Sequence, residues 1–379
     1  MTGAEFWDSA DTHVAVAPGH DDGSVRDFVE AECGKHGWCL FQTSGSEGLP
    51  KWVALTKRAL TISARAVNEH FGVTKADRWL LALPTWHVGG FGILARCFVG
   101  GNALRVFEGR WDAAAFAACC TREEATLASL VPTQVFDLVA AKIAAPESLR
   151  AVLVGGGAMS PDLALAARDL GWPLFPTYGM TETASQVASA RPFGDGELEV
   201  LPIWQVSTDA EGVLTVRGEA LASGYVVSQG EQWCWEPISA SGGLQTRDRV
   251  SLLQDGSRQL LRFLGRESGI VKILGELVAL GPIQQRIEDL RLQSEFQEGD
   301  AAICDVPDPR QGARLILATT GMSENRAESL LDELNRDLRP FEQIFRAISL
   351  PKLPRGALGK LRINDLRASL LASEATSGK

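Results

Sequence analysis

The chain has 379 residues, of which 45% are hydrophobic and 22% charged, with a formal net charge of -10 and an isoelectric point near 5.2. This length predicts two or more domains, because single cores stop growing near roughly 250 to 300 residues. The acidic balance argues against a nucleic-acid or anionic-membrane partner, since those partners require clustered Lys and Arg. We therefore expect a small-molecule partner.

Targeting and membrane signals are weak. The N-terminus "MTGAEFWDSADTH" carries acids and lacks the basic-then-apolar order of a signal peptide. The longest uncharged stretch, Trp79 to Ala95, is interrupted by Pro84 and His87 and falls short of the roughly 18 apolar residues of a membrane span. Seven Cys without a CxxC pair do not suggest a disulfide framework or a zinc site. We expect a cytoplasmic protein without a membrane span.

In chain order, Thr56 is a plausible N-cap for a first helix beginning at Lys57, so the Gly/Ser-rich loop before it is expected between a strand and that helix. From about residue 57 to 190, short β-rich runs then alternate with helical patterns. The strands are expected in "RWLLALP", "NALRVF", "ATLASL" and "RAVLVGG", and the helices in Val88 to Gly100, Asp112 to Cys120 and Pro132 to Ile143. This alternation is typical of a largely parallel sheet.

From roughly Leu201 to Phe263, short strands with turn signals indicate an antiparallel β region. A smaller unit begins near Gly265 and contains a helix from Asn325 to Leu338. The expected fold is α/β: a large N-terminal domain, 1–264, with mainly parallel sheets flanked by helices plus an antiparallel β region, and a small mobile α+β C-terminal domain, 265–379.

The loop "TSGSEGLPK" has the composition of a phosphate cradle. Backbone N–H groups and hydroxyls can converge on an anion, and Lys51 adds a positive charge. The Walker A spacing is absent, and Gly/Ser segments are often plain surface linkers. Both readings stay open at this point. The residues concerned are Thr43, Ser44, Gly45, Ser46, Gly48 and Lys51.

"PTYGMTETAS" offers an aromatic ring at Tyr178, a hydroxyl at Thr181 and a carboxylate at Glu182, which could stack on a purine, donate to a phosphate and bind Mg²⁺. A strand-to-helix turn with a capping threonine is the structural alternative.

Three charged residues could likewise contact a nucleotide or be solvated turn residues. Asp248 in "TRDRV" could accept from ribose hydroxyls, Arg266 in "FLGRESG" could donate to the same sugar, and Lys360 follows a glycine in "ALGKLR". His87 in "PTWHVGG" could gate a pocket or be a satisfied, half-buried imidazole.

Taken together, six ordered stretches resemble the adenylate-forming superfamily of acyl-CoA synthetases, adenylation domains and luciferases. "TSGSEGLPK" is similar to TSGSTGxPK, "YGMTET" to YGxTE, and "RGEALASGY" to the GE…GY stretch. "TRDRV" is similar to TGD, "GRESGIVKILGELV" to GRxDDxIKxxGExV, and "LPRGALGKLR" to LPxxxxGKxxR. The match runs from about Phe41 to Arg362.

The resemblance implies a two-step reaction with ATP, Mg²⁺ and coenzyme A. A carboxylate attacks the α-phosphate of ATP to give an acyl-adenylate and pyrophosphate, and a thiol, usually coenzyme A, then takes the acyl group. Such chemistry depends mainly on positioning and charge neutralisation, so no covalent protein nucleophile is expected.

The resemblance also assigns roles to residues. The loop from Thr43 to Lys51 would hold the β- and γ-phosphates, and Thr181 and Glu182 would contact the α-phosphate and Mg²⁺. Lys360 would neutralise charge that develops between the carboxylate and the α-phosphate. Adenine would be flanked by Tyr178 and by the glycines Gly155, Gly156 and Gly157. Ribose would be held by Asp248 and Arg266.

Family members rotate the small domain between the two steps about a hinge just after GR. Here Ser268 and Gly269 stand where an acidic pair is usual, and Gly269 could absorb a backbone change. The thiolation segment would include Lys272 and Gly275.

Two further departures concern charge. Glu47 replaces the usual Thr in the phosphate loop, where it could point outward or help to hold Mg²⁺. Arg247 replaces the usual Gly before Asp248. Because only 42 residues precede Thr43, we expect a shortened N-terminal subdomain.

The shortened N-terminal subdomain and one further stretch resemble most the o-succinylbenzoate-CoA ligases of menaquinone biosynthesis. That stretch is "PTWHVGGFGILARCFVGGNAL". In that reading Arg96 pairs with the second carboxylate of the acid, and the pocket walls include His87, Gly89, Gly90 and Gly155. The alternative for Arg96 is a helix-surface or ion-paired residue.

Two rival functions stay open: another aryl or acyl acid-CoA ligase with the same nucleotide motifs, and a non-catalytic nucleotide-binding scaffold. The expected partners are a carboxylic acid, ATP and CoA, with a homodimer as one option for assembly.

Overall fold

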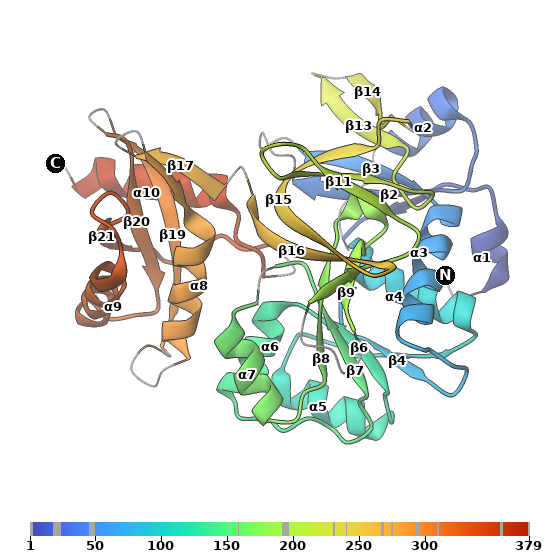
Figure 1. Cartoon of the computed structure of the whole chain (residues 1–379), viewed down its shortest axis with the longest axis horizontal. Coiled ribbons are helices and arrows are strands. Elements are labelled where there is room, and N and C mark those ends of the chain that lie inside the picture. The colour runs from blue at the N-terminus through green and yellow to red at the C-terminus, as the bar shows by residue number, and fades with distance from the viewer. Residues whose placement is uncertain are drawn as a thin grey trace. The chain divides into compact units, whose positions relative to one another are not determined.

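A computed structural model describes residues 3–17, 24–44, 50–157, 159–191, 197–229, 232–239, 241–266, 269–273, 276–292, 296, 298–308, 311–356 and 359–377 (Figure 1). The chain divides into two compact units. The first comprises Met1–Gly156 and Ala167–Leu264, and the second comprises Gly157–Ala166 and Gly265–Lys379. The grouping of residues 157–166 with the second unit was not expected from the sequence. Assigning nucleotide binding to one domain and a lid function to the other stays a prediction.

An eleven-stranded mixed sheet dominates the first unit, in the order β11-β12-β15-β16-β10-β9-β8-β7-β6-β4-β5. The section from β8 to β5 is parallel, as the alternating pattern predicted. Its strands are β4 (Arg78–Leu81), β5 (Ala103–Val106), β6 (Leu127–Leu130), β7 (Ala151–Val154) and β8 (Leu174–Tyr178). The antiparallel section comprises β9 (Ala188–Ala190), β10 (Leu198–Val200), β11 (Gln205–Thr208), β12 (Val213–Arg217), β15 (Leu244–Asp255) and β16 (Arg258–Arg266).

The helices between these strands follow the expected pattern closely. The predicted segments correspond to α4 (Val88–Gly100), α5 (Ala113–Arg122) and α6 (Pro132–Ala140), and the first unit also holds α1 (Ala4–Asp8), α2 (Val25–Cys33) and α3 (Lys57–His70). Helix α7 (Pro161–Asp169) crosses the boundary between the two groups of residues. The Thr56 side chain caps α3 by accepting from the Ala59 amide at 3.0 Å, which confirms the predicted N-cap.

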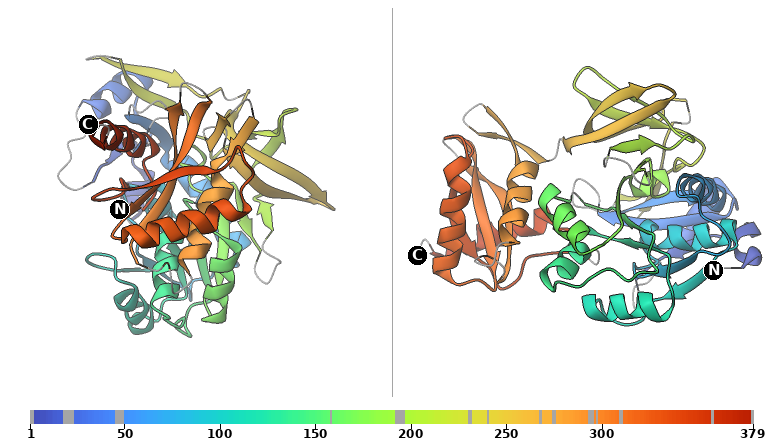
Figure 2. Two further views of the ribbon diagram at one scale, coloured as in Figure 1. Left: turned by 90° about the vertical axis from the view of Figure 1, so that its left-hand side faces the viewer. Right: turned by 60° about the horizontal axis from the view of Figure 1, so that its bottom comes forward.

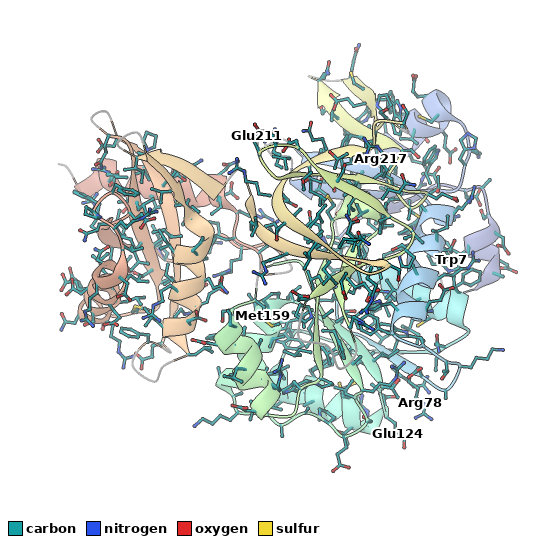
Figure 3. The ribbon with its side chains drawn as sticks, in the orientation of Figure 1. Trp7, Arg78, Glu124, Met159, Glu211 and Arg217 are labelled. Carbon is teal, nitrogen blue, oxygen red and sulfur yellow. The ribbon has the colours of Figure 1, made fainter. Side chains whose placement is uncertain are left out.

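A second sheet of the first unit has five strands, in the order β1-β2-β3-β13-β14. They are β1 (His13–Ala15), β2 (Trp38–Ser44), β3 (Pro50–Thr56), β13 (Gly224–Gln229) and β14 (Gln232–Pro237). Trp7 of α1 (Figure 3) packs against α4, where its ring stacks on that of Phe98 with 5.5 Å between centroids. Antiparallel pairing therefore also occurs outside the predicted 201–263 region.

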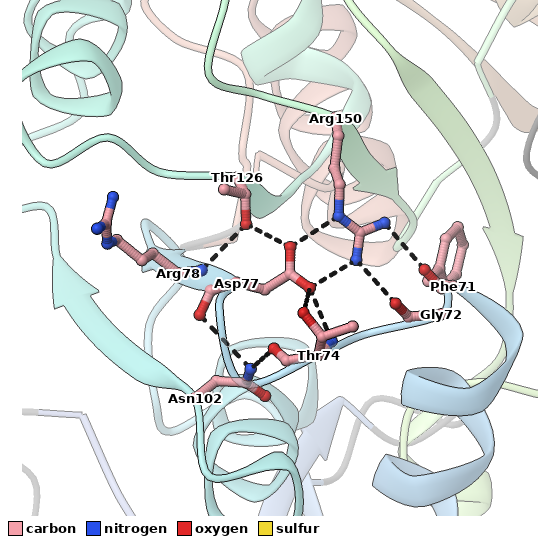
Figure 4. Close-up of polar contacts among 8 residues, drawn as sticks. All are labelled: Phe71, Gly72, Thr74, Asp77, Arg78, Asn102, Thr126 and Arg150. Carbon is pink, nitrogen blue, oxygen red and sulfur yellow. Dashed lines mark hydrogen bonds and ion pairs between the residues drawn. The ribbon is translucent and has the colours of Figure 1, made fainter.

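A polar cluster joins the amino ends of three parallel strands (Figure 4). Asp77, just before β4, accepts from Arg150 Nε at 2.7 Å and Nη2 at 2.9 Å, and from the Thr126 hydroxyl at 2.8 Å. Arg150 precedes β7, Thr126 precedes β6, and Arg150 also donates to the Phe71 carbonyl at the end of α3. Burial would raise the pKa of Asp77, but these donors and the Thr74 amide outweigh it and lower the pKa to about 2.

The second unit is a layered α/β structure (Figure 2). Its strands are β17 (Ile270–Ile273) and β18 (Glu276–Ala279), which pair together, and the sheet β19 (Asp300–Asp308), β20 (Gly312–Thr320) and β21 (Ile344–Ser349). Its helices are α8 (Leu280–Arg291), α9 (Glu324–Asp337) and α10 (Ile363–Ser377).

Strand β19 alternates its side chains between two cores. Ala301 and Ile303 pack with residues of α8 and α9, whereas Ala302 and Cys304 pack with residues of α10. The three-stranded sheet is thus covered on both faces. Within the part of the chain that the structure describes, every helix falls short of the length and hydrophobicity needed to cross a bilayer.

Candidate functional site

The described ends of the predicted phosphate loop lie in two paired strands. Strands β2 and β3 pair in antiparallel register, with Thr43 opposite Lys51 and Ser44 opposite Pro50. The expectation of a loop between a strand and a helix was wrong, because the residues after the loop form β3 before α3 begins. Gly45, Ser46, Glu47 and Gly48 lie outside the described residues.

Lys51, Glu182 and Tyr225 form a charged cluster beside these two strands. Lys51 Nζ lies 3.5 Å from Glu182 Oε1 and 3.6 Å from the centroid of the Tyr225 ring. The Tyr225 hydroxyl donates to the same Glu182 oxygen at 3.1 Å. Burial, reinforced by Glu182, raises the pKa of the Tyr225 phenol, so it stays protonated and donates.

Strand pairing explains why these groups meet. Val227 of β13 pairs with Lys51, and Tyr225 pairs with Val53, so Lys51 and Tyr225 are diagonal neighbours on one face of the sheet. Glu182 sits in η1 (Thr181–Thr183), a single 3₁₀ turn. Its carbonyl accepts from the Ala222 amide at 2.7 Å, which ties the turn to the segment before β13.

This cluster suits a magnesium-bound polyphosphate. Among the described residues there is no group of three or more His, Cys, Asp or Glu side chains that could hold a metal by themselves. Protein Mg²⁺ sites that serve nucleotides commonly use one or two carboxylates together with phosphate oxygens and water. Glu182 fits that pattern, and Lys51 supplies a cation beside it.

Tyr178 and Asp248, predicted for adenine and ribose, are in direct contact. The Tyr178 hydroxyl donates to Asp248 Oδ2 at 2.7 Å. Asp248 is 5% exposed, and its amide donates to the Thr246 hydroxyl at 3.1 Å. Arg247 lies on the exposed side of β15, so this departure from the family pattern points away from Asp248.

The three glycines predicted near adenine, Gly155 to Gly157, follow β7, and Tyr178 ends the neighbouring parallel strand β8. Ligands of open α/β sheets commonly bind at the carboxyl ends of such strands. A Cβ at Gly155 would come within 2.6 Å of the Thr177 hydroxyl, and Gly156 has a φ of +81°. Both positions therefore favour glycine. Arg266 ends β16, and its side chain lies outside the described residues.

The residues predicted for the acid pocket begin helix α4. His87 is the N-cap, and burial lowers the pKa of its half-buried imidazole, so the ring is neutral at pH 7. Its Nε2 is buried and lacks a hydrogen-bond partner among the described residues. Gly90 serves close packing, since a Cβ there would lie 2.3 Å from the Pro84 carbonyl, whereas Gly89 would meet only a Leu83 methyl at 3.6 Å.

Arg96, on the same helix, is 2% exposed. Its Nη1 and Nη2 lie at 3.4 and 3.5 Å from the hydroxyls of Ser129 and Ser185, and its guanidinium carbon is 5.3 Å from the Trp79 ring centroid. Its Nε has no hydrogen-bond partner in the described part of the chain. No described carboxylate forms an ion pair with it.

Burial contradicts the surface alternative for Arg96, and no carboxylate among the described residues supplies the ion pair of the other alternative. Burial lowers its pKa to about 10, which still leaves the guanidinium protonated at pH 7. A desolvated cation with long hydrogen bonds interacts strongly with any anionic group that reaches it.

Lys360 lies in the second unit, in a turn between β21 and α10, and is exposed. Of the predicted hinge and thiolation residues, Ser268 and Gly275 lie outside the described residues, as does the side chain of Lys272 in β17. Gly265, just before this segment, adopts a φ of +145°, and nothing lies within 4 Å of the place that a Cβ would take. A side chain at Gly265 would be strained, so this position favours glycine.

Sequence reasoning missed Tyr225, Ser129, Ser185 and Trp79 as neighbours of functional side chains. Tyr225 could have been found from the sequence, because it is the tyrosine of "RGEALASGY", one of the stretches that resemble the family. Ser185 directly follows "YGMTETA" and has an unusual φ of +99°. Ser129 and Trp79 lie within buried strands, where nothing in the sequence distinguishes them from core residues.

Comparisons with known proteins agree with this arrangement. Residues 29–226 match the family model described as AMP-binding enzyme. A 2-succinylbenzoate–CoA ligase of Bacillus subtilis is 28% identical over 346 residues, covering 86% of this chain and 68% of the relative. One from Enterococcus faecalis is 27% identical over 341 residues, covering 85% of this chain and 67% of the relative.

Solved structures give the same result. The o-succinylbenzoate CoA synthetase of Bacillus subtilis in complex with the acyl-adenylate intermediate OSB-AMP is similar with a TM-score of 0.73 at 26% identity, covering 88% of this chain and 68% of that one. The same enzyme in complex with ATP and magnesium is similar with a TM-score of 0.71 at 27% identity, covering 86% of this chain and 69% of that one. The family model matches more than half of the chain, and the matched residues include Lys51, Arg96 and Glu182. This chain belongs to the AMP-binding enzyme family.

Proposed function

We propose that this chain is an ATP-dependent acid-CoA ligase that converts o-succinylbenzoate, through its acyl-adenylate, into the CoA thioester used in menaquinone biosynthesis. The observation that carries the substrate assignment is Arg96, a buried guanidinium without an ion-paired carboxylate among the described residues. A dicarboxylic acid offers one carboxylate for activation and a second one for this cation. A simple fatty acid offers nothing to pair with it.

In the first step an oxygen of the acid carboxylate attacks the α-phosphorus of ATP. The bond to the bridging oxygen of the β-phosphate breaks, and pyrophosphate leaves with the electron pair. In this proposal Lys51 holds the β- and γ-phosphates together with the loop from Thr43. Glu182 would hold Mg²⁺, which would supply positive charge beside the phosphates.

The nucleotide is oriented by the adjoining pair Tyr178 and Asp248, which present a ring face for adenine and a carboxylate for ribose hydroxyls. Because the Tyr178 hydroxyl already holds Asp248, both groups are fixed before the nucleotide binds. Such preorganisation lowers the entropy cost of reaching the reactive geometry.

Charge grows on the oxygens around the α-phosphorus as the attack proceeds. The proposed role of Lys360 is to neutralise that charge, and Thr181 donates to the α-phosphate. In the second step the thiolate of coenzyme A attacks the acyl carbon, and AMP leaves. The segment with Ser268, Gly269, Lys272 and Gly275 is proposed to serve that step.

Pyrophosphate release with a panel of acids tests the proposal. We expect turnover with o-succinylbenzoate and poor turnover with benzoate and hexanoate. Good turnover of either simple acid, with none of o-succinylbenzoate, would leave an acid-CoA ligase of different specificity. Absence of ATP–pyrophosphate exchange with every acid would favour a non-catalytic scaffold. The cytoplasmic location and a homodimer remain predictions from sequence, which cell fractionation and light scattering would check.

A further inference from the structure

The described residues around Lys360 are held to one another by backbone contacts within the second unit. Arg355 and Leu361 form an isolated antiparallel bridge. The Gly356 amide donates to the Lys360 carbonyl at 2.8 Å, and the Gly359 amide donates to the Gly356 carbonyl at 2.9 Å. The backbone on both sides of the lysine is therefore hydrogen-bonded.

The Arg355 side chain fastens the turn around Lys360 to the sheet. Its Nε and Nη2 donate to the two carboxylate oxygens of Asp300 at 2.7 and 3.0 Å, which is a bidentate ion pair. Its Nη1 donates to the Gly359 carbonyl at 2.8 Å. One guanidinium thus connects the residue before Lys360 to the first residue of β19.

Asp300 is itself held from a second direction. Arg291, at the end of α8, donates through Nη1 to Asp300 Oδ1 at 2.7 Å and through Nη2 to the Gly299 carbonyl at 2.7 Å. Only 23% of the Asp300 side chain and 13% of the Arg291 side chain are exposed. Such partly buried, bidentate contacts are held more firmly than ordinary surface ion pairs.

We propose that Arg355 and Asp300 are positioning residues for Lys360. The inference rests on the function proposed above, in which Lys360 acts in adenylation. A lysine side chain has a long flexible stem, so the direction in which it reaches a ligand depends on the backbone from which it starts. The Asp300–Arg355–Gly359 connection fixes that backbone next to Lys360. It should therefore matter for the step that uses the lysine and not for the thiol step.

The test separates the two half-reactions. Arg355→Met keeps a long side chain and removes the guanidinium. We expect ATP–pyrophosphate exchange with o-succinylbenzoate to fall about 10²-fold in rate at saturating substrates, the scale of a misplacement of about 1 Å. The KM values for acid and ATP should not change. Thiolysis of supplied o-succinylbenzoyl-adenylate by coenzyme A should keep its wild-type rate.

A matched control removes a comparable ion pair that does not contact the turn. Arg367 of α10 donates through Nη2 to Asp305 Oδ1 at 2.5 Å and through Nε to the Asp305 carbonyl at 3.0 Å, also on β19. Arg367→Met should leave both half-reactions unchanged. Asp300→Asn provides a second route to the same defect if Arg355→Met folds poorly, which thermal unfolding would show.

Pairing the two substitutions tests whether the residues act together. The variant with both Arg355→Met and Asp300→Asn should be no slower in adenylation than the slower single variant, because both break one connection. Arg355→Lys should recover part of the rate. Independently of activity, deuterium uptake at the Gly356 and Gly359 amides should rise in Arg355→Met while the rest of β19 and β20 stays protected.

Three results would overturn the inference: unchanged adenylation in Arg355→Met when Lys360→Ala is slow, an equal fall in both half-reactions, or unchanged deuterium uptake in the turn. Failure of the proposed function has a different signature. There, wild-type protein shows no exchange with o-succinylbenzoate, or Lys360→Ala exchanges at the wild-type rate, whatever the turn amides do.

Discussion

Replacing Arg96 by methionine should separate substrate recognition from stability. The guanidinium is 2% exposed, and among the described residues its hydrogen bonds are long, at 3.4 and 3.5 Å, to the Ser129 and Ser185 hydroxyls. A buried charge without a close counter-charge costs several kcal/mol of desolvation, and replacing buried charged groups by apolar ones of similar volume is often neutral or stabilising by about 1 to 4 kcal/mol. We therefore expect Arg96→Met to unfold at the same or a higher temperature.

The activity of Arg96→Met toward o-succinylbenzoate, in contrast, should fall. Truncating one partner of a buried, hydrogen-bonded charge pair typically costs about 2 to 5 kcal/mol. A central loss of about 3 kcal/mol corresponds to roughly a 10²-fold fall in kcat/KM for o-succinylbenzoate. An analogue in which hydrogen replaces the second carboxylate has no pair to lose, so its kcat/KM should stay the same. Because burial lowers the pKa of Arg96 only to about 10, the wild-type preference should persist through neutral pH.

The assay measures pyrophosphate release with both acids for the wild type, Arg96→Met and an exposed control on α3, Arg65→Met. Thermal unfolding without ligands is measured on the same samples. The control should match the wild type in every measurement. The reasoning fails if Arg96→Met loses activity toward both acids by the same factor. It also fails if its unfolding temperature drops along with its activity, since Arg96 would then be a structural residue.

The other predictions concern three separate parts of the chain. Lys360→Ala should slow adenylation by at least ~10²-fold, the scale for loss of a charge-stabilising donor, and spare thiolysis of supplied acyl-adenylate; unchanged pyrophosphate exchange would refute the role. Tyr225→Phe removes the 3.1 Å hydrogen bond to Glu182, and should raise the Mg²⁺ concentration for half-maximal exchange about tenfold, because a hydrogen bond to a charged group contributes about 1.5 to 3 kcal/mol. An unchanged Mg²⁺ requirement would show that the phenol does not orient that carboxylate. Asp77 has a folded pKa of about 2, below its ordinary value near 4, so its stabilisation is fully present above about pH 4 and is lost as the pH falls toward 2. Asp77→Asn should therefore lower the free energy of unfolding at pH 7 by about 2 to 3 kcal/mol and flatten its dependence on pH between about 4 and 2, which urea titrations at several pH values would measure.

Local patterns in the sequence determined much of the fold. The helix Val88–Gly100, the cap at Thr56 and the four strands β4 to β7 were predicted correctly, because each depends on neighbouring residues alone. Strand β3 was missed. Its buried run from Trp52 to Leu55 has only four residues, a length at which strand and helix cannot be told apart by periodicity.

The order of motifs along the chain also led to the family and to most of the candidate residues, since each motif is a short local string. Only the tertiary structure decided which of these residues meet. The contact between Lys51 and Tyr225 depends on β13 pairing with β3 across more than half of the first unit's sequence. No local pattern specifies a pairing between strands so distant in sequence.

The state of Arg96 was likewise decided by the fold. The sequence allowed an exposed, an ion-paired or a substrate-binding arginine. Burial arises because Trp79, Ser129 and Ser185 arrive from three other segments and enclose the guanidinium without supplying a carboxylate. The sequence by itself thus determined the local elements and the motifs, and packing alone determined the environment that gives each charged group its chemistry.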